Sequence, residues 1–389
     1  MTSVSAGASG NSTPSTARFA LLAIFVMHGI LFGIWTTQIP LAKLRLDVSL
    51  TVFGLALLCV AIGAVIAMPI AGVLVNLCGS ARMTWVTGAM FSVFVAGPAL
   101  APSLPLFMVS AMLMGAAIGS MDVGMNAHGL LVERALRKPV MSGFHGGFSI
   151  GAAVGTILGA WVLGKVGTHA QLAFFCGLSL AGILACASLL LPTALDRGLS
   201  SQNFALPTRT TIGLGLLCFL ALMIEGTVAD WGALMLDERF AVDAAVAAMA
   251  FGFYQTGMAV ARFTGDWLRA RAGAVRLVAF SAAFTAVGTA AALLMPGVHA
   301  SLAAFAIAGL GIGNVAPVLF AGGGRLEPDA PGRGIAAVTT LGYAGFLAGP
   351  PLIGIPADVI GLQGALFVTV AAALIIALCA RMVKAADTY

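Results

Sequence analysis

The chain has 389 residues, of which 60% are hydrophobic and only 8% are charged. A soluble domain carries roughly 25% charged residues, so this composition excludes an ordinary water-soluble fold and indicates a protein whose solvent is the lipid bilayer. The net charge of +5 does not indicate nucleic-acid binding, because the basic residues lie in short loops between apolar runs rather than along one stripe.

Apolar segments follow one another along the chain. Each is long enough for a helix, which needs about 20 residues to cross roughly 30 Å of hydrocarbon. None has the alternating pattern of a transmembrane barrel. We therefore predict an all-α polytopic membrane protein with twelve spans: 18–39, 51–76, 83–101, 105–131, 140–165, 169–191, 210–236, 243–268, 275–295, 299–323, 334–357 and 361–382.

The longest connection between spans divides the chain into two halves. The first residues are Ser, Thr, Ala and Gly without charge, which is typical of a disordered tail. The predicted organisation is a disordered cytoplasmic tail at 1–17, an N-terminal six-helix half at 18–192, a cytoplasmic linker at 193–209, a C-terminal six-helix half at 210–383 and a cytoplasmic tail at 384–389.

Basic residues are distributed unequally between the two sides of these spans. An even number of spans puts both termini on one side, and 14 of the 19 Lys and Arg residues then fall on that side. Four fall on the other side, and Arg262 lies within a span. The positive-inside rule predicts that both termini are cytoplasmic, in the inner or plasma membrane of the cell.

Glycine motifs of the first half recur in the second half, in the same order and at nearly the same offset along the chain. This predicts a duplicated six-helix unit, an architecture of transporters built from two parallel repeats. The matches are Gly115-x-x-Ile118-Gly119 with Gly309-x-x-Ile312-Gly313, Gly147-Phe148-x-x-Gly151 with Gly345-Phe346-x-x-Gly349, and Gly72 with Gly265.

Asp122 is the foremost functional candidate, because a charge at mid-bilayer costs roughly 2.5 to 3.5 kcal/mol and must face a cavity or a partner. The spacing of Gly115, Gly119, Asp122, Asn126 and Gly129 puts them on one helix face, which suits the lining of a cavity. Apolar surroundings disfavour the charged form of a carboxylate in general, so such a group can load and release a proton near neutral pH. Asn126, one turn away, could bond this carboxylate or a solute hydroxyl.

Four further charged residues lie in the seventh and eighth spans. Glu225 is near mid-span and is a second candidate for the cavity and for proton coupling. Asp230 lies toward the outside, where it could bind solute as part of an outer gate. Arg262 and Asp266 are four residues apart, and we expect them to form an ion pair that locks helices on the inner side.

The remaining candidates for solute binding are polar residues in the spans. Histidine can titrate near physiological pH, and amide or phenol groups can bond a polar solute. They are His28, Gln38, His145, Tyr254, Gln255 and Asn314.

Enzyme chemistry and cofactors are not expected. The sequence contains no nucleotide-binding motif, no spacing of a catalytic triad and no metal-ligand cluster. ATP is therefore not the expected energy source, and a coupling ion is more plausible.

At these residues the chain resembles the major facilitator superfamily over nearly its whole length, and within it the fucose-permease-related, MosC-like branch of rhizopine transport proteins. The resemblance implies that Asp122 takes part in proton coupling and that His145 stands where sugar permeases carry a solute-binding Gln. The chain departs from the superfamily at Asn76 and Leu77, where the usual loop carries Asp and Arg, and at Gln38, in the region where fucose permeases carry an Asp. The segments that carry the resemblance are Gly119-Ser-Met-Asp122-Val-Gly-Met-Asn126, His145-Gly-Gly-Phe-Ser-Ile-Gly151, Glu225-Gly-Thr-Val-Ala-Asp230-Trp231 and Arg262-Phe-Thr-Gly-Asp266.

The expected function is secondary active transport of a small polar solute, such as a sugar, polyol or amino-polyol, by alternating access of a monomer. Proton-coupled symport is the first expectation, and proton-coupled export of drugs or metabolites is the alternative. Two other classes are a non-transporting membrane sensor and an intramembrane enzyme. A sensor predicts long loops or an appended domain, and an enzyme predicts a nucleophile and base or a metal site.

Overall fold

The computed structural model describes residues 13–138, 140–192 and 205–387. Within these ranges every regular element is a helix, and ten stretches are long and apolar enough to cross a membrane when α3 is joined to α4 and α10 to α11. The elements are α1 (Pro14–Leu46), α2 (Leu50–Cys78), α3 (Ser80–Phe94), α4 (Ala96–Leu100), α5 (Leu104–Leu136), α6 (Met141–Ala187), α7 (Ile212–Phe240), α8 (Ala244–Ala272), α9 (Ala274–Leu294), α10 (Val298–Ile312), α11 (Val315–Leu326), α12 (Pro331–Leu378) and the 3₁₀ helix η2 (Ala380–Asp387).

Two of the long helices each contain two membrane crossings. α6 is kinked at Gly167, where φ is 77°, and α12 is kinked at Gly361, where φ is 75°. These backbone angles favour glycine, because a side chain at positive φ is strained. The expected connections near 165–169 and 357–361 are thus sharp kinks, and the expected twelve-span, all-α fold is confirmed.

The ends of the described chain differ from the expected tails. α1 begins at Pro14, because the hydroxyl of Thr13 accepts a hydrogen bond from the Thr16 amide at 3.2 Å and proline suits the first helical position. The predicted tail at 1–17 is therefore too long. Its segment 1–12 lies outside the described ranges, as does the segment 193–204 of the predicted linker. Part of the predicted C-terminal tail belongs to η2, where the guanidinium of Arg269 bonds the carbonyl of Ala386 at 2.5 Å.

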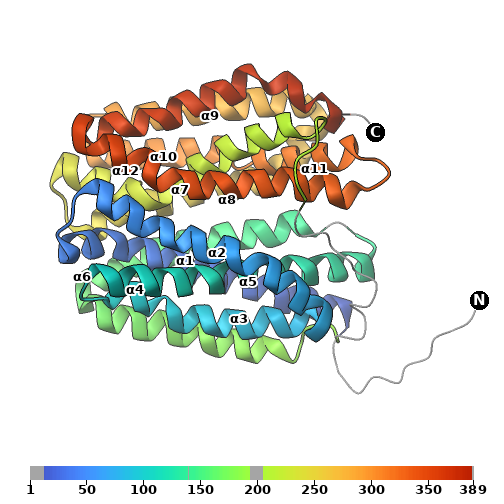
Figure 1. Cartoon of the computed structure of the whole chain (residues 1–389), viewed down its shortest axis with the longest axis horizontal. Coiled ribbons are helices and arrows are strands. Elements are labelled where there is room, and N and C mark those ends of the chain that lie inside the picture. Colours follow the sequence, from blue (N-terminus) through green and yellow to red (C-terminus); the bar gives the residue numbers. More distant parts are fainter. Residues whose placement is uncertain (1–12, 139, 193–204, 388–389) are drawn as a thin grey trace, which may run out of the picture.

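The two halves lie side by side, with α1–α6 in blue to green on one side and α7–α12 in yellow-green to red on the other (Figure 1). Within the halves, α1 packs against α6 and α7 against α12. Between the halves, α6 packs against α8 and α2 against α12. These four interface helices bring residues far apart in the sequence together, and three of them, α6, α8 and α12, each carry one residue of the polar site described below.

The backbone repeats itself at a constant offset along the chain. Asp47, Gly79 and Gly167 have positive φ values of 47°, 88° and 77°. Ala241, Gly273 and Gly361 stand at one and the same distance after them in the sequence, and their φ values are 48°, 78° and 75°. The expected duplicated six-helix unit is therefore confirmed.

The same offset corrects two of the sequence matches. A methyl group on Gly151 would lie 2.0 Å from the carbonyl oxygen of Val26, and one on Gly345 would lie 2.2 Å from that of Phe219. Gly345 thus corresponds to Gly151, one helical turn from the expected Gly147. By the same offset Gly72 corresponds to Asp266 rather than to Gly265.

Candidate functional site

The carboxylate of Asp122 is held by two donors from different halves of the molecule. It lies near the middle of α5, where Asn126 Nδ2 donates to Asp122 Oδ1 at 3.0 Å and to its backbone carbonyl at 2.9 Å. From α12, the hydroxyl of Tyr343 donates to Asp122 Oδ2 at 2.5 Å. Hydrogen bonds to a charged group are stronger than neutral ones, so this contact ties α5 to α12.

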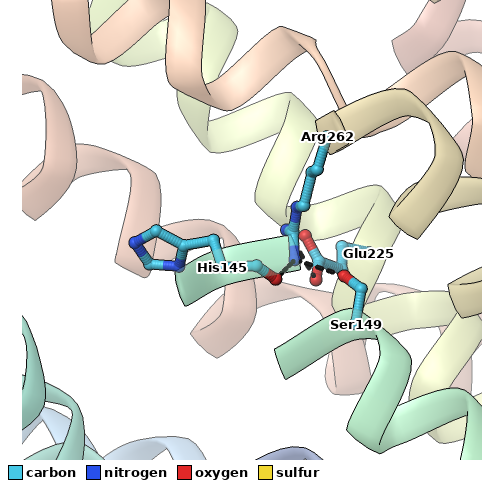
Figure 2. Close-up of polar contacts among 4 residues, drawn as sticks. All are labelled: His145, Ser149, Glu225 and Arg262. Carbon is cyan, nitrogen blue, oxygen red and sulfur yellow. Dashed lines mark hydrogen bonds and ion pairs between the residues drawn. The ribbon is translucent and has the colours of Figure 1, made fainter. Parts of the chain in front are cut away.

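A second polar group surrounds Arg262 on α8. Its guanidinium forms an ion pair with Glu225 on α7, at 3.7 Å from Oε1. It also donates to Ser149 Oγ at 2.6 Å and to the carbonyl oxygen of His145 at 3.3 Å, both on α6. Figure 2 shows these acceptors converging on the guanidinium from the two halves.

The two polar groups are electrostatic neighbours. Glu225 lies close enough to Tyr343 to interact with its hydroxyl, and close enough to Tyr254 to do the same. Tyr254 in turn interacts with Arg262. The Asp122–Tyr343 hydrogen bond and the Glu225–Arg262 ion pair thus influence each other electrostatically, and we call these four residues with Asn126 and Ser149 the polar centre.

Both contacts across the halves use hydroxyl groups at equivalent positions. Ser149 and Tyr343 correspond by the offset of the repeat, on helices α6 and α12. Ser149 accepts from a cation of the other half, and Tyr343 donates to an anion of the other half. The repeat thus places a hydroxyl at two equivalent positions. One of these hydroxyls binds a cation of the other half, and the other binds an anion.

The expected ion pair between Arg262 and Asp266 is wrong. The side chain of Arg262 is only 12% exposed and turns into the interface between the halves, where its terminal nitrogens meet three acceptors while its Nε has no partner among the described residues. Asp266 is exposed on α8 and forms no ion pair with the described residues. Spacing of four residues brings two side chains near each other, but the acceptors on α6 and α7 outcompete that neighbour.

The two candidate histidines pack against aromatic rings. The imidazole of His145 points away from Arg262 (Figure 2) and meets the ring of Phe25 edge-on, with centroids 5.6 Å apart. His28 is 3% exposed and lies between Phe91 and Phe148, at 5.4 and 5.3 Å. His145 therefore contributes its backbone, rather than its imidazole, to the polar centre.

Gln38 lies apart from the polar centre, inside the N-terminal half. It is fully buried and donates to Gln171 Oε1 on α6 at 2.5 Å. Gln171 donates in turn to the hydroxyl of Thr37 and to the carbonyl of Gly159. This network joins α1 to the part of α6 that follows the kink at Gly167. Gln38 therefore bonds one helix to another inside the N-terminal half.

Gln255 is buried with neither amide atom bonded to any described residue, and the hydroxyl of Tyr254 is in the same condition. An unbonded buried polar atom costs roughly 1–3 kcal/mol, so these groups call for a partner. Gln255 is two helical turns from Arg262, which puts both on one face of α8.

Asn314 and Asp230 occupy different places. Asn314 stands at the break between α10 and α11 and packs against Gly265 within the C-terminal half. Asp230 is half-buried on α7, with no hydrogen bond or ion pair to the described residues. Neither joins the polar centre.

The small residues of α5 do not line a cavity as expected. A methyl group on Gly115 would lie 1.8 Å from the carbonyl oxygen of Val60, and one on Gly119 would lie 2.9 Å from the backbone of Ala64. These glycines let α5 press against α2, while Asp122 and Asn126 follow one turn later. The helix face predicted to line a cavity is therefore divided: its glycines pack against α2, and its Asp122 and Asn126 form polar contacts.

Sequence reasoning missed Ser149 and Tyr343. Serine is common in membrane helices and carries no signal by itself. Tyrosine is rare here, with three in the chain, and its position in the middle of a span was the one signal that pointed to Tyr343.

Comparison with protein families matches residues 20–321 to the Major Facilitator Superfamily. A membrane protein MosC of Rhizobium meliloti is 32% identical over 92% of this chain and 88% of its own length. An uncharacterised MFS-type transporter of Yersinia pestis is 31% identical over 92% of this chain and 94% of its own length.

Solved structures show the same fold at low sequence identity. The nucleoside transporter NupG is 14% identical and superposes with a TM-score of 0.72, covering 94% of this chain and 98% of that one. A bacterial homologue of the human lysosomal transporter Spinster is 15% identical, with a TM-score of 0.68 over 96% of this chain and 98% of that one.

Proposed function

Because this chain belongs to the major facilitator superfamily, and is thus a secondary transporter of small molecules across a membrane, we propose that it carries a small polar solute by proton-coupled symport. The proposed solute class is a sugar, polyol or amino-polyol. We further propose that both termini are cytoplasmic and that the monomer is the working unit, because one chain holds both halves of the transport path.

The contact between Asp122 and Tyr343 carries this proposal. A carboxylate inside a bilayer is costly unless it is partnered or protonated. Its donor comes from the opposite half, so adding a proton to Asp122 changes a bond between the two bodies that must rock against each other. Protonation and the movement of the halves are coupled through this one bond.

Polar and aromatic groups near the centre suit a hydroxylated solute. The ion pair described above offers acceptors and donors, and Gln255 offers one of each without a partner among the described residues. The ring centroid of Phe32 lies 6.2 Å from that of Phe148 and 5.7 Å from that of Phe251, so aromatic rings of both halves meet here. Rings stack on the apolar faces of sugars while amides and charges bond their hydroxyls.

The test is solute flux into proteoliposomes that contain the purified protein. A thermal-shift screen with sugars, inositols and amino-polyols first identifies a solute that stabilises the folded state. Flux of that solute is then measured with and without an imposed pH gradient. We expect the gradient to drive accumulation, and the gradient direction that does so separates uptake from export.

Asp122→Asn is the decisive variant, with Asp243→Asn as a control that removes a charge from the loop before α8. We expect Asp122→Asn to abolish proton-driven accumulation while it spares exchange of labelled for unlabelled solute, and the control to retain both. Wild-type flux that ignores the pH gradient would remove the proton role of Asp122.

A further inference from the structure

The start of α2 meets α12 across the two halves, just before the kink at Gly361. Asp358 Oδ1 accepts from the Leu50 amide at 2.9 Å, and Oδ2 accepts from the Thr51 amide at 3.0 Å. Amides in the first turn of a helix have no acceptor within the helix, and a negative charge there is favoured by the helix dipole. The carboxylate of one half therefore caps a helix of the other half.

The backbones beside this cap are in close contact. The hydroxyl of Thr51 donates to the carbonyl of Gly354 at 3.2 Å. A methyl group on Gly54 would lie 2.8 Å from the carbonyl oxygen of Pro350, and one on Gly354 would lie 2.6 Å from that of Leu50. This end of the interface between α2 and α12 is thus closed without space for a solute.

The equivalent interface between α6 and α8 lacks such a carboxylate. The position that corresponds to Asp358 in the first half is Gly164, where an added methyl group would meet the side chain of Ala245 at an ordinary distance of 3.5 Å. At the start of α8, Asp243 stands where Ser49 stands at the start of α2, and it makes no capping bond with its side chain. The charged contact therefore holds only one of the two equivalent interfaces at this end.

We propose that Asp358 is a latch that keeps this end of the transporter closed and that must release the start of α2 in each transport cycle. The proposal rests on alternating access, but not on the identity of the solute or on a proton at Asp122. When the latch opens, the halves separate at the Asp358 end and draw together at the opposite end, beyond the existing contact of Arg262 with Ser149. The carboxylate thereby sets the balance between the two states.

The test is hydrogen–deuterium exchange of the full-length protein in lipid, without solute, comparing wild type with Asp358→Asn. We expect exchange in residues 50–57 and 350–360 to become roughly 2- to 30-fold faster, the range that loss of a capping carboxylate gives. Exchange in residues 141–149 and 262–268, at the opposite end, should become slower by a similar factor because that end closes. Asp243→Asn, which removes the same charge beside the equivalent helix start, should change neither region.

Faster exchange confined to residues 50–53 in Asp358→Asn, with the opposite end unchanged, would show that Asp358 is only a helix cap and would overturn the latch. If Asp358→Asn fails to fold, Thr51→Ala replaces it, because this change removes the bond to Gly354 and leaves the carboxylate in place. Thr51→Ala should then move both ends in the same directions by a smaller factor, and no change at the opposite end would again overturn the proposal. Loss of proton coupling at Asp122 would leave these exchange patterns unaffected, so the two proposals fail separately.

Discussion

The charged side chains of the polar centre have partners within the membrane, most of them on other helices. For Asp122, hydrogen bonds from Asn126 and Tyr343 replace those that water would make. For Arg262, the replacing contacts are with Glu225, Ser149 and a backbone carbonyl. Each ion is costly alone, and removing one partner of a poorly hydrated pair is more harmful than removing both. The polar centre is therefore a set of dependent residues rather than independent ones.

The ion pair of Arg262 and Glu225 gives a prediction from this dependence. Glu225→Gln leaves the cation with neutral acceptors only, and should lower the free energy of unfolding by about 1–3 kcal/mol. The double variant Arg262→Met with Glu225→Gln should recover most of that loss and yet transport no solute. Thermal unfolding and solute flux measure the two effects. Equal stability of the single and double variants would mean that the pair is not coupled.

The carboxyl group of Asp358 gives a prediction about pH. It lies at the kink end, outside the two crossings of α12, and bonds from Thr51 and the start of α2 lower its pKa from 3.8 to about 2. A lowered pKa in the folded state stabilises the fold above the unfolded value, and this contribution is lost only as pH falls toward 2. The difference in Tm between wild type and Asp358→Asn should therefore stay constant from pH 8 to pH 5 and shrink below pH 4. A difference that disappears between pH 7 and pH 5 would contradict this assignment.

At this scale the sequence predicted the ions but not their partners. The cost of charge in lipid singled out Asp122, Glu225 and Arg262 among a few candidates, and the one-turn spacing predicted the bond from Asn126. Spacing within a helix was a poor guide for Arg262, because its partners come from α6 and α7 and depend on how the helices meet. Tyr343 was missed for the same reason.

Helices in this protein approach each other at glycines. The lengths of the apolar runs in the sequence determine where the membrane-spanning helices begin and end. The span boundaries agreed with the apolar runs to within a few residues in most cases. The joins inside α6 and α12 were predicted as loops, because a sequence shows that a glycine is present but not that its φ is positive. Thr13 as a capping residue followed by Pro14 indicates the start of α1. The prediction placed this start later because the segment before Arg18 has no charge and resembles a disordered tail.

Glycine substitutions test this packing. Gly115→Ala would put a methyl group 1.8 Å from the carbonyl oxygen of Val60, and Gly309→Ala would put one 1.8 Å from that of Tyr254. Forced overpacking of this kind costs about 1–3 kcal/mol, so each variant should unfold at a lower temperature in detergent. Gly177→Ala in α6 is the matched control, because nothing lies within 4 Å of the added methyl group. It should be neutral or slightly stabilising, and equal losses in all three variants would contradict the packing argument.

The whole molecule consists of one six-helix arrangement used twice, and the charge distribution should orient it in the bilayer. The glycine motifs predicted the duplication, although two of the three matches were displaced by up to one helical turn. A short motif can slip by one turn without losing its pattern, whereas the backbone angles fix the register. The polar centre lies where both halves meet, so its composition could not be predicted from either half.

A fusion experiment tests the orientation. The distribution of 14 basic residues against four predicts that the C-terminus is cytoplasmic. Green fluorescent protein attached after Tyr389 should therefore fluoresce in bacterial cells, and alkaline phosphatase at the same place should be inactive. Active phosphatase and dark fluorescent protein would reverse the orientation.

The constant offset between the two halves also bears on ancestry. Two identical six-helix subunits would carry every charge in pairs, one on each subunit, and such a dimer would have no built-in difference between its subunits. In this chain the counterparts of Asp122, Arg262 and Asp358 are Ala316, Met68 and Gly164. Within one polypeptide each copy can change independently, so the two halves share one scaffold while Asp122, Arg262 and Asp358 each occur in one half only.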